Sequence, residues 1–205
     1  MTSPIILATA NPNKVEELEP MLSRAGIVTK PQTEFFREEA IEDGLSFVEN
    51  AIIKARFASE KTGLPALADD SGLEVEALNG QPGIYSARYA GTENGSEEQN
   101  LKKLLSDMAM LPYPQRQARY SCAVVYVKHS RDPMPLIGIG HWYGEILMKP
   151  RTGFGIGYDD VMWIPELVKA VSEIPFEVKN QISHRARAVQ SVINQLNQST
   201  GVSGR

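Results

Sequence analysis

Two adjacent carboxylates, Asp69 and Asp70, close a short apolar run and are followed by Ser71 and Gly72. Burying neighbouring negative charges costs free energy unless something compensates them. A divalent cation is the simplest compensator, and carboxylate oxygens are the ligands that magnesium prefers. The same residue types also favour turns, so the sequence leaves a metal site and a plain turn as alternatives.

A second polar segment, residues 9–14, offers groups suited to an anion. It ends a predicted strand over residues 4–9 and begins a helix that Asn11 caps and Pro12 opens. The free N–H groups and the positive dipole end of such a helix attract phosphate. A capped helix with a solvated lysine is the alternative. The candidate phosphate-binding residues are Thr9, Ala10, Asn11, Pro12, Asn13 and Lys14.

A third cluster combines Lys179, Ser183, His184 and Arg185. On a continuous helix, Lys179 and Ser183 share a face. Together these side chains offer several donors to an anion or to the edge of a base. A fourth segment, residues 42–54, carries Glu42 and other charges at the start of a predicted helix, where solvated charges are the plain interpretation.

Composition excludes several classes of protein. The net charge is −4 with both signs dispersed, so no basic face for nucleic acid is expected. No apolar run approaches the ~18 residues of a membrane span, and residues 1–4 lack the basic start of a signal peptide. The single cysteine, Cys122, lies in an apolar run and is expected to be a buried, inert thiol. A reducing compartment, the cytoplasm, suits that count.

The 205 residues fit one domain, or one domain with two lobes. Hydrophobic periodicity and turn residues predict an α/β fold with a mixed sheet. A helix from residue 12 is expected to kink or end at Pro20. The other predicted helices cover residues 46–61, 96–108 and 177–197. The other predicted strands cover residues 64–68, 73–77, 118–128 and 136–148, the last two antiparallel, and a glycine-rich loop covers residues 152–159.

Known nucleotide and hydrolase signatures are missing: the chain has no P-loop, GxGxxG, HExxH, zinc-ligand spacing or GxSxG. Six segments in register nevertheless resemble the inosine triphosphate pyrophosphatase (HAM1-like) family, its bacterial branch above all. The resemblance covers residues 5–197. The matching residues are Asn11-x-x-Lys14-x-x-Glu17, Glu42-x-Gly44-x-Ser46-Phe47-x-Glu49-Asn50-Ala51-x-x-Lys54-Ala55, Ala68-Asp69-Asp70-Ser71-Gly72-Leu73, Gly80-x-Pro82-Gly83-Ile84-Tyr85-Ser86-Ala87-Arg88-Tyr89, Gly157-Tyr158-Asp159 and Ile182-Ser183-His184-Arg185.

The resemblance implies a long twisted mixed sheet dividing two lobes, with the active site in the cleft between them. It also implies a homodimer and a requirement for Mg²⁺. Asp70 is implied as the general base, and Glu42, Asp69 and Asp70 as the metal site. The implied substrate-binding residues are the phosphate segment already named, Ser71, Ile156, Gly157, Tyr158, Asp159, Lys179, His184 and Arg185.

Two residues depart from the family pattern Gly-Phe-Gly-Tyr-Asp-Pro. Ile156 stands where an aromatic residue would stack on the purine, and Asp160 replaces a proline. Stacking on a base is worth roughly 1–3 kcal/mol. Phe154 and Trp163 are the other aromatic side chains that could cover the base.

The implied reaction converts non-standard purine nucleotides (ITP, dITP, XTP, dXTP) to a monophosphate and pyrophosphate. Two alternatives stay open. One is a Maf-like pyrophosphatase of modified pyrimidine nucleotides. The other is a nucleotide-binding module with weak turnover, against which the intact Glu42, Asp69 and Asp70 argue.

Overall fold

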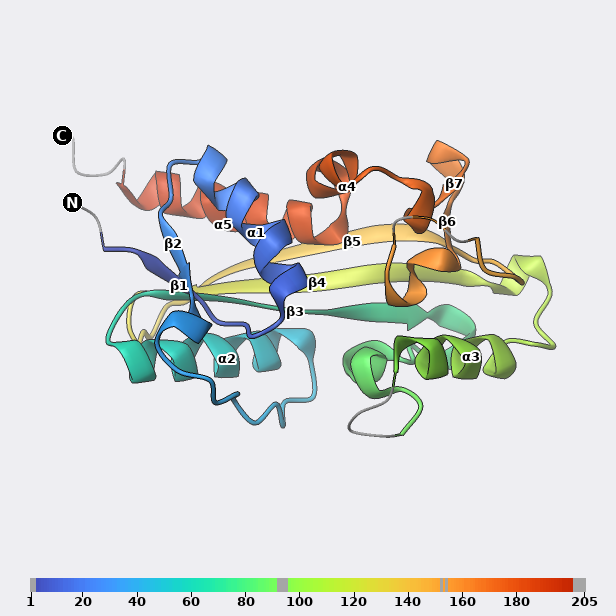
Figure 1. The fold of residues 1–205 in the computed structure, drawn as a ribbon, viewed down its shortest axis with the longest axis horizontal. Helices are drawn as coiled ribbons and strands as arrows, with labels where there is room; N and C mark the ends of the chain where they lie inside the picture. The colour runs from blue at the N-terminus through green and yellow to red at the C-terminus, as the bar shows by residue number, and fades with distance from the viewer. Residues whose placement is uncertain (1–2, 92–95, 152, 154, 201–205) are drawn as a thin grey trace. The chain divides into compact units, whose positions relative to one another are not determined.

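The computed structural model describes residues 3–91, 96–151, 153 and 155–200. Within these residues, seven strands form one sheet in the order β2-β1-β3-β4-β5-β6-β7 (Figure 1). The strands are β1 (Ile5–Leu7), β2 (Thr29–Pro31), β3 (Ala66–Val75), β4 (Gln117–Val127), β5 (Leu136–Ile146), β6 (Met162–Ile164) and β7 (Lys169–Ala170). The α-helices are α1 (Pro12–Arg24), α2 (Phe47–Thr62), α3 (Glu97–Asp107), α4 (Phe176–Ile182) and α5 (His184–Thr200).

Strand pairing makes the sheet a mixed one. β1 pairs in parallel with both β2 and β3, whereas β6 pairs antiparallel with β5 and β7. The predicted α/β fold with a mixed sheet is therefore confirmed. β4 and β5 are neighbours in the sheet, at the positions that the sequence predicts for two long strands.

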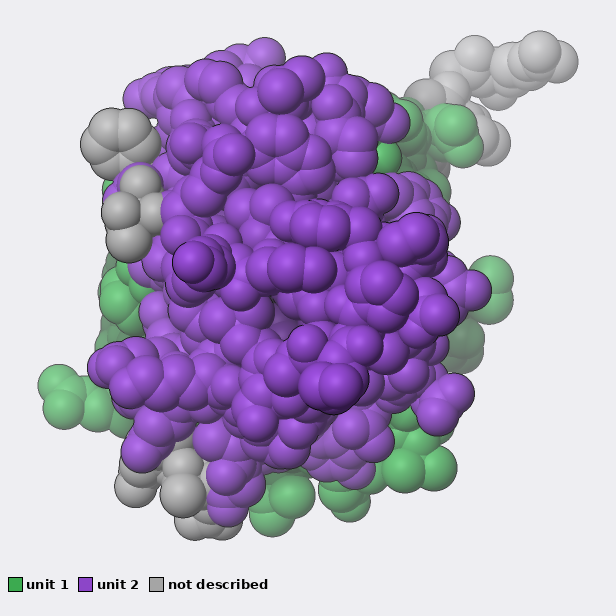
Figure 2. Space-filling view, turned by 90° about the vertical axis from the view of Figure 1, so that its right-hand side faces the viewer, with its two compact units in different colours: residues 1–70, 122–140, 185–205 green, residues 71–121, 141–184 purple. Residues whose placement is uncertain are grey.

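The chain divides into two compact units (Figure 2). Unit 1 comprises residues 1–70, 122–140 and 185–205, and unit 2 comprises residues 71–121 and 141–184. Strands β3, β4 and β5 contribute residues to both units. A single domain spanning residues 1–205 stays a prediction.

Both faces of the sheet are covered by helices in unit 1. Alternate residues of a strand point to opposite faces. On β4, Cys122 and Val124 pack in one apolar cluster with residues of α1 and α5, while Ala123 and Val125 pack in another with alanines of α2. Cys122 is 1% exposed, so the prediction of a buried thiol is confirmed, and this burial raises the pKa of the thiol to about 12.

Unit 2 has a core of its own. Leu73 and Val75 of β3 pack there with Ala118 and Tyr120 of β4 and with Trp142 of β5. Helix α3, which the sequence predicts, adds Leu104, and a capping box between Ser96 and Gln99 stabilises its start. Across the described ranges of both units, no helix is both long and apolar enough to cross a membrane.

The turn alternative at residues 69–72 is wrong. β3 runs without a break from Ala66 to Val75 and includes Asp69, Asp70, Ser71 and Gly72. The strand carries these polar residues because cationic side chains compensate both carboxylates, as described below. Two short apolar runs in the sequence are thus one ten-residue strand.

Two helix predictions also need correction. The helix that Asn11 caps does not end at Pro20 but continues to Arg24, and buried side chains on both sides of the proline, Leu18 and Leu22, hold it in the core. The alternative expectation, a kink at Pro20, stays a prediction. The predicted helix over residues 177–197 is two helices, because Ser183 adopts an extended conformation (φ −66°, ψ 167°). Lys179 and Ser183 therefore do not share one continuous helix.

Arg116 is a large charged side chain that unit 2 buries almost completely, with 2% of its surface exposed. Its guanidinium donates to four backbone carbonyls, those of Met108, Leu111, Ile146 and Leu147, at 2.7–3.1 Å. It joins the end of α3 to the end of β5 without a carboxylate partner among the described residues.

We expect Arg116→Met to lower the free energy of unfolding by about 3–5 kcal/mol, because it leaves several buried carbonyls without a donor. Urea unfolding followed by circular dichroism measures the change. Arg131→Met, at an exposed arginine, is the matched control and should change stability by less than about 0.5 kcal/mol. Equal stability of the two variants would contradict the role of Arg116.

Candidate functional site

The candidate phosphate-binding segment, residues 9–14, joins β1 to α1 as the sequence predicts. Asn11 caps α1 by accepting from the backbone N–H of Asn13 at 2.9 Å, and the Thr9 hydroxyl accepts from the N–H of Asn11 at 3.1 Å. Asn11, Pro12 and Asn13 are exposed, while Thr9 and Ala10 are half-buried. The helix start is thus open to solvent at the place where an anion would approach it.

Asp69 and Asp70 lie on opposite faces of β3, because consecutive strand residues point in opposite directions. The Asp69 carboxylate contacts Lys14 of α1 at 3.2 Å and Arg185 of α5 at 3.1 Å. The Asp70 carboxylate contacts Lys54 of α2 at 2.9 Å. Each face of the strand therefore has its own set of compensating cations.

A buried charge cluster surrounds Asp69. Arg185 also pairs with Glu17 of α1, and both side chains are about 10% exposed or less. Burial alone would raise the pKa of the Asp69 carboxyl, but the charges of Lys14 and Arg185 outweigh it and lower the pKa. The same carboxylates raise the pKa of Arg185, although burial opposes this. Asp69 thus serves as an anchor for two cations that the sequence assigns to substrate binding.

On the other face, Lys54 lies between the two remaining carboxylates. Its ammonium is 3.1 Å from Glu42 and 2.9 Å from Asp70, and Asn50 donates to Asp70 at 3.3 Å. Burial lowers the pKa of Lys54, but the charges of Asp70, Asp69 and Glu42 more than offset this and raise it. Lys54 therefore carries a full positive charge at neutral pH.

The three carboxylates predicted as a metal site are not grouped. Glu42 and Asp70 converge on one cation, whereas Asp69 faces the opposite side of the strand. Among the residues that the structure describes, no three His, Cys, Asp or Glu side chains lie together as a metal-binding group. Magnesium is usually held by one or two protein carboxylates together with substrate phosphates, so the pair Glu42–Asp70 fits such an ion.

In unit 2, Asp159 is the centre of a second polar cluster. It is 4% exposed and belongs to a 3₁₀ turn over Gly157–Asp160. Its carboxylate accepts from the Tyr120 hydroxyl at 2.9 Å and from Lys179 at 2.8 Å. His184 stacks on the Tyr120 ring with 4.9 Å between ring centroids. The structure thus brings together three predicted residues, Asp159, Lys179 and His184.

Other predicted residues of the glycine-rich loop differ in exposure. Ile156 is 46% exposed, whereas Tyr158 is buried and its hydroxyl donates to the backbone carbonyl of Ser86. Gly157 has φ +62°, which favours glycine, and its N–H donates to Glu97. Ser71 lies half-buried within β3.

Phe154 and Trp163 are the two aromatic residues that could cover the base in place of Ile156. Phe154, like Thr152 at the start of the predicted loop, lies outside the described residues. The half-buried Trp163 belongs to β6, and the guanidinium of Arg151 lies 4.7 Å from the centroid of its ring. That side of the Trp163 ring is therefore already covered.

Lys54, Glu17 and Tyr120 contact the predicted site residues but have no predicted role of their own. A signal for Lys54 was present, because Asn50 and Lys54 are four residues apart on α2 and both contact Asp70. Glu17 follows Lys14 by three residues on α1, so both can face β3. Nothing in the sequence around Tyr120 points to Asp159 or His184, which are distant along the chain.

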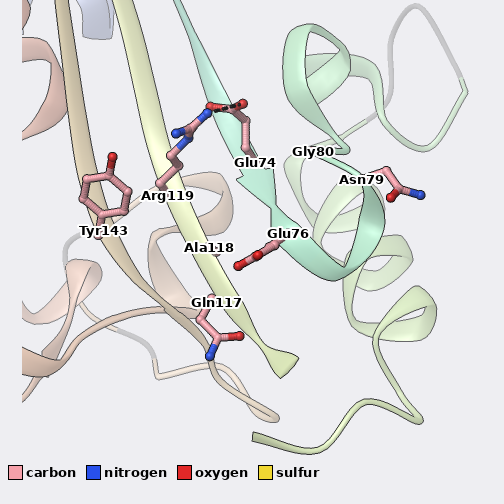
Figure 3. Close-up of a pocket in the computed structure, with 8 residues that line it drawn as sticks. All are labelled: Glu74, Glu76, Asn79, Gly80, Gln117, Ala118, Arg119 and Tyr143. Atoms are coloured by element: carbon pink, nitrogen blue, oxygen red, sulfur yellow. Dashed lines mark hydrogen bonds and ion pairs between the residues drawn. The ribbon is translucent and has the colours of Figure 1, made fainter. Parts of the chain in front are cut away.

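A pocket of about 490 Å³ lies elsewhere in unit 2 (Figure 3). Arg119 and Glu74 form a bidentate ion pair at its edge, at 2.9 and 3.0 Å. Arg119 precedes Tyr120 on β4, so it faces away from the Asp159 cluster. The pocket is lined by Glu74, Glu76, Asn79, Gly80, Gln117, Ala118, Arg119 and Tyr143. It includes none of the predicted site residues.

Two features of unit 1 are suited to a hydrolase that binds a polyanion together with a metal ion. The carboxylates of Glu42 and Asp70 converge on one cation, and the capped start of α1 is open to an anion. The chain belongs to the Ham1 family, whose profile matches residues 5–195. The resemblance inferred from six motifs is therefore confirmed.

Named relatives and solved structures agree with this assignment. A dITP/XTP pyrophosphatase of Photorhabdus laumondii is 50% identical over 192 residues, which cover 94% of this chain and 97% of the relative. One of Vibrio cholerae is 50% identical over 188 residues, covering 92% and 94%. A HAM1 protein from Coxiella burnetii has a TM-score of 0.89 at 41% identity, with 97% of this chain and 100% of that one covered. The Staphylococcus aureus Ham1 protein has a TM-score of 0.85 at 34% identity, with coverage of 96% and 100%.

Proposed function

We propose that this chain is a nucleoside triphosphate pyrophosphohydrolase that converts ITP, dITP, XTP and dXTP to monophosphates and pyrophosphate. The names of relatives about half identical over nearly the whole chain support this substrate class. The observation that carries the chemistry is the ammonium of Lys54 between Glu42 and Asp70, because it shows that these carboxylates converge on a positive charge.

Residues of unit 1 are proposed to bind the triphosphate. The open start of α1 offers N–H groups, and Lys14 and Arg185 supply positive charge while Asp69 fixes both in place. Anchoring long cationic side chains before substrate arrives lowers the ordering cost of binding. Asp69 is thus proposed as a positioning residue rather than a metal ligand.

Glu42 and Asp70 are proposed to hold Mg²⁺. A bound magnesium ion would neutralise part of the triphosphate charge and lower the pKa of coordinated water. Asp70 is proposed to accept the proton of the water that attacks the α-phosphorus, a role that requires hydrogen-bond reach of that water. Lys54 donates to one oxygen of the Asp70 carboxylate at 2.9 Å, and Asn50 donates to the other at 3.3 Å. The second oxygen can accept a further proton donor, because a carboxylate oxygen has about two acceptor sites.

Residues of unit 2 are proposed to read the base. Asp159 can accept from the N1–H of hypoxanthine, and His184 can donate to its 6-oxo group. Lys179 forms an ion pair with Asp159 at 2.8 Å, so the positive charge of Lys179 stabilises the negative charge of that carboxylate. Ile156, with nearly half its surface exposed, is proposed to cover the purine where the family pattern has an aromatic ring.

The test of this function is pyrophosphate release from ITP. We expect stoichiometric IMP and pyrophosphate with magnesium, and a loss of at least about 100-fold after chelation with EDTA, restored by added Mg²⁺. Parallel reactions with dUTP and 5-methyl-UTP test the pyrimidine alternative. Equal rates with and without the metal, or faster hydrolysis of the pyrimidine nucleotides, would contradict the proposal.

Ile156→Phe should lower the KM for ITP by up to about tenfold, because an aromatic ring adds stacking that isoleucine lacks. Steady-state kinetics with ITP measure it. The matched control is Ile139→Phe, since Ile139 is a similarly exposed isoleucine of β5 outside the loop. An unchanged or higher KM in Ile156→Phe would show that another group already covers the base.

A homodimer is also proposed, as the family resemblance implies. Size-exclusion chromatography with light scattering should give about twice the 22.6 kDa of one chain. The proposed compartment is the cytoplasm. The nucleotides from which such an enzyme would remove non-standard purines are made and used there.

A further inference from the structure

Tyr120 is a buried tyrosine of β4 that contacts two candidate base-reading residues at once. Only 7% of its surface is exposed. Its hydroxyl donates to Oδ1 of Asp159 at 2.9 Å. Its ring stacks on the imidazole of His184, with ring centroids 4.9 Å apart and an interplanar angle of 21°. One side chain therefore fixes the position of a carboxylate and the plane of a histidine.

The hydrogen bonds of Asp159 show why the hydroxyl matters. Oδ2 accepts from Lys179 at 2.8 Å and from the N–H of Ile156 at 3.5 Å, while Oδ1 accepts from Tyr120. Each carboxylate oxygen has about two acceptor sites. Among the hydrogen bonds given by the described residues, Oδ1 is therefore the oxygen with acceptor capacity left for a ligand, and it is the oxygen that accepts from Tyr120.

We infer that Tyr120 is a positioning residue that sets which purine the enzyme accepts. This inference rests on the proposed function and deepens it. The terminal torsion of aspartate is broad, so a carboxylate held at only one oxygen can turn its plane. With the Tyr120 hydroxyl in place, Oδ1 points one lone pair at a ligand N–H, and the stacked His184 keeps its donor in a matching plane.

The test is Tyr120→Phe, which keeps the ring and the stacking on His184 but removes the hydroxyl. We expect the ratio of kcat/KM for ITP to kcat/KM for ATP to fall about tenfold. The loss should appear mainly as a higher KM for ITP, because Glu42, Lys54 and Asp70, the residues proposed for hydrolysis, belong to unit 1. A purely structural role would instead lower stability and affect both nucleotides alike.

Tyr126→Phe is the matched control. Tyr126 lies on the same strand, is 8% exposed and packs in a core cluster of unit 1. Its variant should leave the ITP-to-ATP ratio at the wild-type value. An equal fall in the ratio for Tyr126→Phe would overturn the inference, because the effect would then belong to any hydroxyl lost from β4.

A double-mutant cycle separates positioning from packing. If Tyr120 acts through Asp159, Tyr120→Phe should change the ratio less than twofold when Asp159→Asn is already present, since effects through a shared partner are not additive. An unchanged ratio in the single Tyr120→Phe variant, or a full tenfold fall in the Asp159→Asn background, would overturn the inference. Failure of the wild-type protein to hydrolyse ITP would instead overturn the proposed function.

Discussion

Asp70→Asn should lower kcat for ITP by about 10²–10⁴-fold, the range typical of removing a general base. The substitution removes the negative charge that would accept a proton from water and bind a metal ion. An asparagine still offers a carbonyl oxygen to Lys54, which also keeps its partner Glu42 at 3.1 Å. The free energy of unfolding should therefore change by less than about 1 kcal/mol.

The measurement is turnover at saturating ITP and magnesium, combined with urea unfolding of the same preparation. Asp43→Asn, at an exposed carboxylate next to Glu42, removes the same charge nearby and should keep wild-type kcat. Near-wild-type turnover by folded Asp70→Asn protein would rule out the role proposed for Asp70. A comparable loss in Asp43→Asn would mean that general charge, and not one carboxylate, governs the rate.

The neighbouring Asp69 shows which features of the site could be predicted from the sequence and which could not. Residue types and family motifs were sufficient to select Asp69 and Asp70, but not to separate their roles. While a turn at residues 69–72 was possible, the sequence did not place the two carboxylates on opposite sides, because a turn does not force consecutive side chains apart. Once β3 is one continuous strand, alternation places one carboxylate with Lys14 and Arg185 and the other with Lys54.

Long elements with a clear pattern were predictable, whereas short ones were not. β4 and α3 begin and end within two residues of their predicted bounds, because β-branched composition and a capping box are local signals. The two- and three-residue strands β2, β6 and β7 have no such pattern and exist only through their pairing. The break at Ser183 was missed for a related reason: local helix preference continues through it, while the buried contacts of His184 and Arg185 are long-range.

The hydrogen bond between Tyr120 and Asp159 is another long-range contact that local sequence patterns do not predict. Thirty-nine positions separate the hydroxyl from the carboxylate, and no spacing rule joins β4 to the turn at Gly157–Asp160. What the sequence supplied was the acidic residue itself, through the Gly157-Tyr158-Asp159 motif. What the structure adds is the orientation of that acid, which decides what it can read on a base.

That orientation underlies the second large effect, the choice of purine. ITP and XTP should be hydrolysed with kcat/KM about 10⁴-fold above that of ATP, as in sites built on hydrogen bonds to the accepted base. The carboxylate of Asp159 pairs with Lys179 at 2.8 Å, and a carboxylate accepts hydrogen bonds, so it suits the N1–H of hypoxanthine. Adenine presents an acceptor at N1 and a donor at position 6, so both contacts would be mismatched and buried polar groups left unpaired.

GTP is the more demanding comparison, because guanine shares both favourable edges with hypoxanthine. Its exclusion must come from the 2-amino group, which has to clash or lose its solvation, while the 2-oxo group of xanthine is tolerated. We therefore expect GTP below ITP and XTP, and at or above ATP. The measurement is kcat/KM for the four triphosphates at equal free magnesium, with Asp159→Asn as the variant that should narrow the gap between ITP and ATP. If ATP were hydrolysed as well as ITP, reading of the base by Asp159 and His184 would be wrong, even with the pyrophosphatase chemistry intact.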